Sequence, residues 1–307
     1  MRYSSLSMKS RCIFCICAVW ATAIAILFPV TVNAQRLPGM SDDPWLGYFS
    51  GYTRKNFEFG INNEGQSEIY LLGQRNKKRI GLTRTIKIYA EVHVETAPGK
   101  FSVKRFKDNE GFSTEMKPGL DHKEAKFTAE TSGDAKVEIT VKYDRNRIIM
   151  DGRILDRGTL KDGKLYLVYK VKVPAMYGRT YESADERKLK NVMRRDKFRF
   201  IRAENEKRVS LKTYAELDLR DDDKAKGGVT EITVDMSAQE GNVFIFTTLD
   251  ETGVIELENK YFDKKAPLWK GYTVMWKREF IETEDASKGD SKAKPTQGIS
   301  PFVIEIK

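Results

Sequence analysis

The sequence predicts an all-β protein made of antiparallel units, either β-sandwiches or jelly-roll-like folds, with one short helix. Three observations support this prediction: apolar and polar residues alternate over many short segments, turn-forming residues separate these segments, and a single stretch has helical spacing. The composition agrees, because 40% hydrophobic and 32% charged residues in a chain of 307 are typical of a globular protein rather than of a disordered or polytopic membrane protein.

The first 34 residues have the pattern of a secretory signal peptide. A basic start precedes an apolar run over residues 13–32, and the small residues Val32 and Ala34 offer a cleavage site before Gln35. We therefore predict a signal peptide over residues 1–34 and an exported protein, either secreted or periplasmic. The alternative is an uncleaved anchor, because about 20 apolar residues can just span a bilayer. All three cysteines lie in this segment, so we expect neither disulfides nor thiolate chemistry in the rest of the chain.

Alternation with a period of two predicts the strands. The strongest signals cover residues 85–95, 136–143, 164–173, 209–219 and 302–306. In residues 164–173, one side of the expected strand carries Leu165, Leu167, Tyr169, Val171 and Val173. Just before it, Asp162 and Gly163 form a pair that favours a tight hairpin turn.

Residues 183–196 break this pattern. The stretch begins with a capping box and carries three apolar residues at helical spacing, which predicts a short helix. We use it to divide the chain into a β-sandwich-like domain over residues 35–174, a helical connector over residues 175–196 and a second β unit over residues 197–307. The alternative is one continuous β domain.

The sequence contains few candidate catalytic groups. The sequence contains no Gly-x-Ser-x-Gly elbow and only two histidines, His93 and His122, which excludes a three-histidine metal site. His93 alternates with Glu91 and Glu95 along one strand. Such a group could bind a metal or transfer protons, but a solvated strand face with ion pairs is the favoured interpretation. We expect no metal and no cofactor, the catalytic residues are unknown, and whether the protein is an enzyme stays open.

Basic residues concentrate around the predicted connector. Residues 186–208 contain ten Lys or Arg and four acids, an excess of six in a chain whose formal net charge is +10. Such a concentration can steer an anionic partner to the protein. The alternative is a basic helix that only keeps the protein soluble. The candidate basic ligand-binding residues are Arg187, Lys190, Arg194, Arg195, Lys197 and Arg199.

Four aromatic residues form a second candidate site. Trp45 and Tyr48, and likewise Trp269 and Tyr272, share the spacing Trp-x-Gly-Tyr. On an exposed sheet face they could stack on sugar rings, and the alternative is that they are core residues. Alternation places Tyr48 and Tyr52 on the same face of a strand. We expect Trp45 to be partly exposed.

These observations favour an exported, non-catalytic binding or envelope-associated β protein. Its expected partner is an anionic polysaccharide or another anionic or carbohydrate component of the cell envelope. The alternative is a carbohydrate-active hydrolase or lyase with its carboxylates in a sheet groove, and a structural envelope protein without a ligand is a third option. Nucleic acid is the least favoured partner because of the export signal. Membrane contact is expected only through the N-terminal segment, if that segment is not cleaved.

Overall fold

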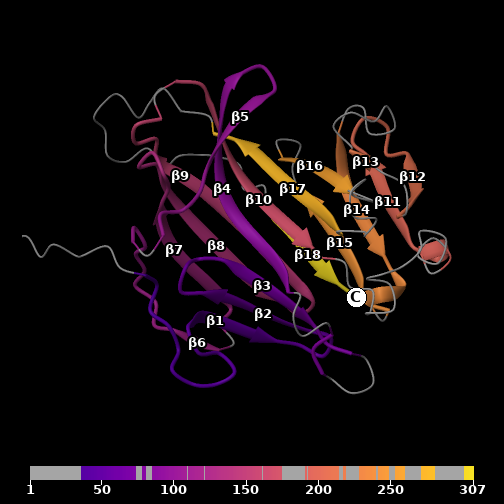
Figure 1. Cartoon of the computed structure of the whole chain (residues 1–307), viewed down its shortest axis with the longest axis horizontal. Coiled ribbons are helices and arrows are strands. Elements are labelled where there is room, and N and C mark those ends of the chain that lie inside the picture. Colours follow the sequence, from indigo (N-terminus) through magenta and orange to yellow (C-terminus); the bar gives the residue numbers. More distant parts are fainter. Residues whose placement is uncertain are drawn as a thin grey trace, which may run out of the picture. The chain divides into compact units, whose positions relative to one another are not determined.

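Strands make up most of this protein, of which Figure 1 shows a computed structural model. The structure describes residues 36–73, 78–80, 85–108, 110–120, 122–160, 162–174, 191, 193–213, 217–218, 228–239, 241–248, 253–259, 271–280 and 301–307. Of these residues 63% lie in strands and 4% in helical turns, and no helix among them reaches seven residues. None of the described helical segments is long and apolar enough to cross a membrane. The predicted all-β class is confirmed.

Eighteen strands and two short 3-10 turns lie within the described residues. The strands are β1 (Tyr48–Thr53), β2 (Phe57–Asn62), β3 (Ser67–Leu71), β4 (Ile86–Ala97), β5 (Lys100–Lys104), β6 (Gly119–Leu120), β7 (Glu124–Glu130), β8 (Lys136–Asp144), β9 (Arg147–Asp156), β10 (Lys164–Val173), β11 (Lys197–Arg202), β12 (Arg208–Lys212), β13 (Leu217–Asp218), β14 (Val229–Asp235), β15 (Val243–Thr248), β16 (Gly253–Asn259), β17 (Tyr272–Glu279) and β18 (Phe302–Ile306). The turns are η2 (Met193–Arg195) and η4 (Ser237–Gln239).

Ladder pairings join the strands into one large, curled sheet. One row of strands runs β6-β1-β2-β3-β4-β10-β17-β16-β13, with β5 paired to the second half of β4. A second row runs β7-β8-β9-β18-β15-β14-β11-β12. A single pair, Val229 with Ile255, joins the rows between β14 and β16. These ladders are antiparallel except for the short β1–β6 pair.

The core lies between the inward faces of the two rows. Tyr169 of β10 stacks on Trp276 of β17 with 5.5 Å between the ring centroids. Both rings also stack on Phe302 of β18, a strand of the other row, at 6.4 and 6.1 Å. Leu165 and Leu167 of β10 are buried on the same side as Tyr169, because successive side chains of a strand point to opposite faces. The inward face of β10 is therefore the one that its sequence predicts.

The predicted signal peptide and most of the predicted helix lie outside the described residues. Residues 1–35 and 175–190 are not described, and the described end of the predicted helix is the 3-10 turn η2. The division of the chain at residues 175–196 stays a prediction. Ladders β10–β17 and β9–β18 join strands from either side of that division.

One detail of the predicted alternation is wrong, in strand β1. A β-bulge between Tyr48 and Ser50 adds a residue to this strand, so that Tyr48 and Tyr52 point to opposite faces. Tyr52 stacks on Tyr143 of the core with 4.7 Å between the centroids. Tyr48 instead covers Gly60 on the outer face, where a Cβ atom would clash with the tyrosine ring.

We predict that Phe302→Ala lowers the free energy of unfolding by about 3–5 kcal/mol, because removing this ring opens a cavity between the two rows. Leu155→Ala is the control, since this side chain is 46% exposed, and it should change stability by less than about 0.5 kcal/mol. Urea unfolding followed by tryptophan fluorescence measures both variants. Equal losses in the two would contradict the packing described for Phe302.

Candidate functional site

Strand β10 carries the candidate site on its outward face. Its ladders with β4 on one edge and with β17 on the other hold it in the middle of the first row (Figure 1). After Lys164, which begins the strand and pairs with Glu279, the side chains that alternate with its core residues are, in order, Tyr166, Val168, Lys170 and Lys172. The two lysines stand about 6.6 Å apart along the strand, which is the repeat of alternate residues.

Three hollows meet at these lysines. The Glu91 hollow has a volume of about 400 Å³ and shares Lys172 with the lysine hollow, whose volume is about 430 Å³. The lysine hollow shares Lys170 and Glu258 with the Phe101 hollow, whose volume is about 410 Å³. Tyr89 and Arg105 also line the Glu91 hollow. Lys87 and Thr273 line the lysine hollow, and Val103 and Met275 line the Phe101 hollow. We term this continuous surface the β10 groove, and its hollows have the size of small-molecule sites.

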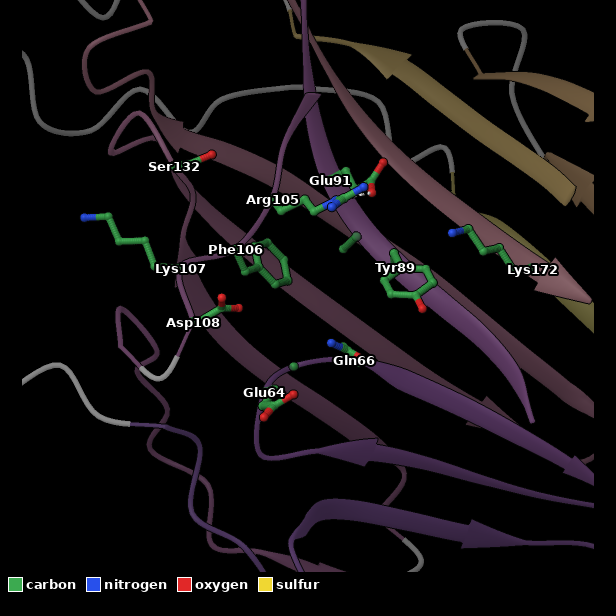
Figure 2. Close-up of a pocket in the computed structure, with 12 residues that line it drawn as sticks. Glu64, Gln66, Tyr89, Glu91, Arg105, Phe106, Lys107, Asp108, Ser132 and Lys172 are labelled. Carbon is green, nitrogen blue, oxygen red and sulfur yellow. Dashed lines mark hydrogen bonds and ion pairs between the residues drawn. The ribbon is translucent and has the colours of Figure 1, made fainter. Parts of the chain in front are cut away.

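The Glu91 hollow lies where strand β4 loses its neighbours on one edge. The pairing of β3 with β4 ends at Ile88 and that of β5 begins at Val92, so residues 89–91 have no ladder partner on that edge among the described strands. Figure 2 shows Arg105 reaching toward Glu91 at this opening. A gap in the sheet therefore lies next to a pair of opposite charges.

Glu91 is a buried carboxylate held by basic side chains. It is 3% exposed, Nε2 of His93 lies 3.1 Å from its Oε2, and Nε of Arg105 donates to its Oε1 at 3.4 Å. Burial opposes ionisation, but the hydrogen bond with His93 and the positive charge of Lys170 outweigh it and lower the pKa of Glu91. The expectation of a solvated strand face is therefore wrong for Glu91. Within the described residues no group of three or more His, Cys, Asp or Glu side chains is placed to hold a metal ion.

The lysines of the groove repel one another. Lys172 lies directly opposite Lys87 in the β4–β10 ladder, and like charges at opposite positions of an antiparallel pair are destabilising. Lys87 is 4.0 Å from the carboxylate of Glu68, and Nζ of Lys172 lies 5.0 Å from the centre of the Tyr89 ring. Neither Lys170 nor Lys172 makes an ion pair within the described part of the chain. Partial burial and the charge of Lys170 lower the pKa of Lys172.

The predicted basic site lies elsewhere in the chain. Its described members are Arg194, Arg195, Lys197 and Arg199. They belong to η2 and β11, and none of them lines the β10 groove. Arg199 forms an ion pair with Asp235 at 3.3 Å, and Arg187 and Lys190 lie outside the described residues. This site stays a prediction.

The predicted aromatic residues are mostly buried. Trp45 is 6% exposed, so the expectation that it is partly exposed is wrong. Its ring packs edge-on against Tyr48 at 5.3 Å, because glycines of β1 and β2 leave room for it. Tyr48 is half-buried and donates a hydrogen bond to Glu68 at 2.6 Å. Tyr272 is 3% exposed, and Trp269 lies outside the described residues. The alternative interpretation, in which these rings belong to the core, describes Tyr272, whereas Trp45 is buried beside Tyr48 on the outer face of β1 and β2.

Sequence reasoning misses the lysines of the groove, Lys87, Lys170 and Lys172. A usable signal exists for the last two, because residues that alternate with core positions of a strand face outward. No local signal exists for the pairing of Lys87 with Lys172, because the two residues are far apart in the sequence.

Comparison with known proteins finds no matching family model and no similar curated protein. The chemistry of the site is therefore drawn from its own residues. The groove offers cations, a buried carboxylate and apolar surface, and these can bind an anion without any covalent step.

We predict that Glu91→Gln lowers the free energy of unfolding near neutral pH by about 2 kcal/mol, because it removes charge-assisted hydrogen bonds from a buried position. The lowered pKa of Glu91 sets the pH dependence of this effect. The ionised carboxylate stabilises the fold above its ordinary pKa, and this contribution disappears as the pH falls through the lowered value. The stabilities of the wild type and the variant should therefore converge in acid.

Glu124→Gln is the matched control for this prediction, because its side chain is 44% exposed and pairs with Lys142 on the surface. Urea unfolding near neutral pH and at about pH 3 measures the difference for each variant. If Glu91→Gln keeps the same deficit at both pH values, the assigned network around Glu91 is wrong.

Proposed function

We propose that this protein is an exported, non-catalytic binding or envelope-associated protein whose partner is an anionic polymer, such as an acidic polysaccharide, bound in the β10 groove. Export rests on the N-terminal segment described above. The observation that supports the binding site is the placement of Lys172 directly opposite Lys87, with Lys170 on the same face. Like charges held directly opposite each other destabilise the sheet locally, and such destabilising arrangements concentrate at functional sites.

A bound anion would offset the repulsion between these lysines, because each of them attracts it. Lys170 and Lys172 follow each other along β10 on the outward face, so anionic groups on a chain lying parallel to the strand would meet both. Two carboxylates of this face pair with other cations, Glu91 with Arg105 and Glu256 with Lys277. A third, Glu258, lines the lysine hollow and the Phe101 hollow and forms no ion pair with Lys170 or Lys172 within the described residues. They leave the lysines available to a partner. The groove therefore selects for negative charge rather than for neutral polymers.

A second candidate function is a carbohydrate-active hydrolase or lyase. One observation favours it: the Glu91 carboxylate and the His93 imidazole lie 3.1 Å apart next to a hollow that also holds cations. Screening the protein on acidic and neutral polysaccharides for released reducing ends or unsaturated products tests this alternative. Activity that Glu91→Gln abolishes would favour it over simple binding.

We predict that Lys170→Ser combined with Lys172→Ser weakens binding to heparin-like or pectin-like polymers by about tenfold or more, because two charge contacts are lost. Lys126→Ser combined with Lys142→Ser is the matched control. It changes the net charge equally, but these lysines pair with Glu138 and Glu124 on another surface, so the affinity should be kept. Isothermal titration calorimetry at two salt concentrations measures both.

The variant with Arg194, Arg195 and Arg199 all changed to Ser separates the groove from the basic site predicted by charge density. The groove predicts that this variant binds the polymers like the wild type. Loss of binding here, with binding kept when Lys170 and Lys172 are replaced, would move the site to η2 and β11 and overturn the proposal for the groove.

A further inference from the structure

The end of the β10 groove away from Lys172 is apolar, although it belongs to an outward sheet face. Val168 of β10 points outward yet is 1% exposed. Phe101 and Val103 of β5 are 40% and 44% exposed, and they line the Phe101 hollow together with Val168 and Met275. The outer face of an antiparallel sheet is ordinarily polar, so this surface departs from the expected pattern.

Exposed apolar side chains that gather around a hollow indicate a binding surface. A third exposed apolar residue, Val254 of β16, is 37% exposed and lies directly opposite Lys277 of β17, which also lines the hollow. Single exposed apolar residues need no explanation, but Phe101 and Val103 stand side by side at one hollow. We take this hollow as part of the binding site.

The apolar end and the cationic end of the groove are continuous. Tyr166, Val168, Lys170 and Lys172 follow one another along β10, so the outward face changes from apolar to cationic over about 20 Å. Lys170 marks the change, because it lines both the Phe101 hollow and the lysine hollow. A ligand that follows β10 would meet apolar surface first and positive charge next.

The polar groups at the apolar end are already satisfied. Lys277 forms an ion pair with Glu256 at 2.5 Å, and its Nζ lies 5.5 Å from the centre of the Phe101 ring. The hydroxyl of Tyr166 donates to Glu95 at 3.1 Å, and its pKa is raised to about 12 by burial and by this bond. The one cation of this hollow that makes no ion pair within the described residues is Lys170.

We infer that the anionic partner also carries an acyl chain and is therefore amphiphilic, with the acyl chain in the Phe101 hollow and its anionic groups on Lys170 and Lys172. This inference rests on the proposed function and names the chemical class of the partner for the same groove. Charge complementarity fixes the direction of the ligand, since the unpaired lysines lie only toward one end among the described residues.

An acyl chain fits this hollow better than a sugar ring. A sugar requires free hydrogen-bonding groups around its hydroxyls, and Tyr166 and Lys277 are engaged with carboxylates. The Phe101 ring meets Tyr166 edge-on at 5.7 Å and is also approached by Lys277. The rest of the apolar surface is aliphatic, formed by Val103, Val168 and Met275. Such surface gains from burial under methylene groups.

Calorimetry with three probes tests the inference: dodecanoate below its micelle concentration, a neutral detergent with a chain of the same length, and an acidic oligosaccharide without an acyl chain. We expect the wild type to bind dodecanoate at least about tenfold more tightly than the neutral detergent, because only dodecanoate carries a negative charge that the lysines attract. The double variant Phe101→Ser with Val103→Ser should lose at least about tenfold in affinity for dodecanoate and keep its affinity for the oligosaccharide. Replacing Lys170 and Lys172 by Ser should weaken both.

Leu155→Ser is the matched control, since it removes an apolar side chain that is 46% exposed and does not line the groove. Phe101 and Val103 are themselves exposed, so their replacement should leave the fold intact. The circular dichroism spectrum of the double variant, which should match that of the wild type, verifies this before calorimetry. Unchanged dodecanoate affinity in the Phe101 and Val103 variant overturns the inference. So does a wild type that binds the oligosaccharide but not dodecanoate, which leaves the proposed function intact. If the affinity for the oligosaccharide is the same with and without Lys170 and Lys172, the proposed function is overturned instead.

Discussion

Strand β10 is held on both edges, by β4 and by β17, and this double pairing fixes the direction of every side chain that it carries. Its inward residues, such as Tyr169, complete a stack with Trp276 and Phe302 across the core. The strand cannot rotate or slip by one residue without moving these rings into water. All cysteines lie within the first 34 residues, so the described strands are held by packing and hydrogen bonds rather than by disulfides.

The same constraint explains the charges on the outward face. Because the inward face sets the register, Lys172 is held opposite Lys87 despite their repulsion. Glu91 offsets part of this charge from a buried position, where His93 and Arg105 keep it ionised. The fold thus holds cations close together on a surface that a partner can reach. Electrostatic attraction and the apolar end of the groove then act on one ligand from a single rigid strand.

Alternation in the sequence suffices to predict the all-β class and the inward residues of β10, because a strand has a period of two wherever its pairing is regular. It fails at Tyr48, where a bulge shifts the period, and bulges have no reliable local signal. Charge density along the sequence leads to the region around Arg199, whereas the groove depends on which strands become neighbours. Lys87 and Lys172 meet through a ladder between segments far apart in the chain, so no local pattern reveals them.

The most direct test of the account is the titration of the Lys172 ammonium group followed by NMR, with and without a bound anionic polymer. Partial burial and the charge of Lys170 should hold its pKa below the ordinary lysine value of about 10.4 in the free protein. Bound anion should raise that pKa, while the resonance of Lys142 on another strand stays unchanged. A Lys172 that titrates like free lysine and does not respond to the polymer would contradict the account.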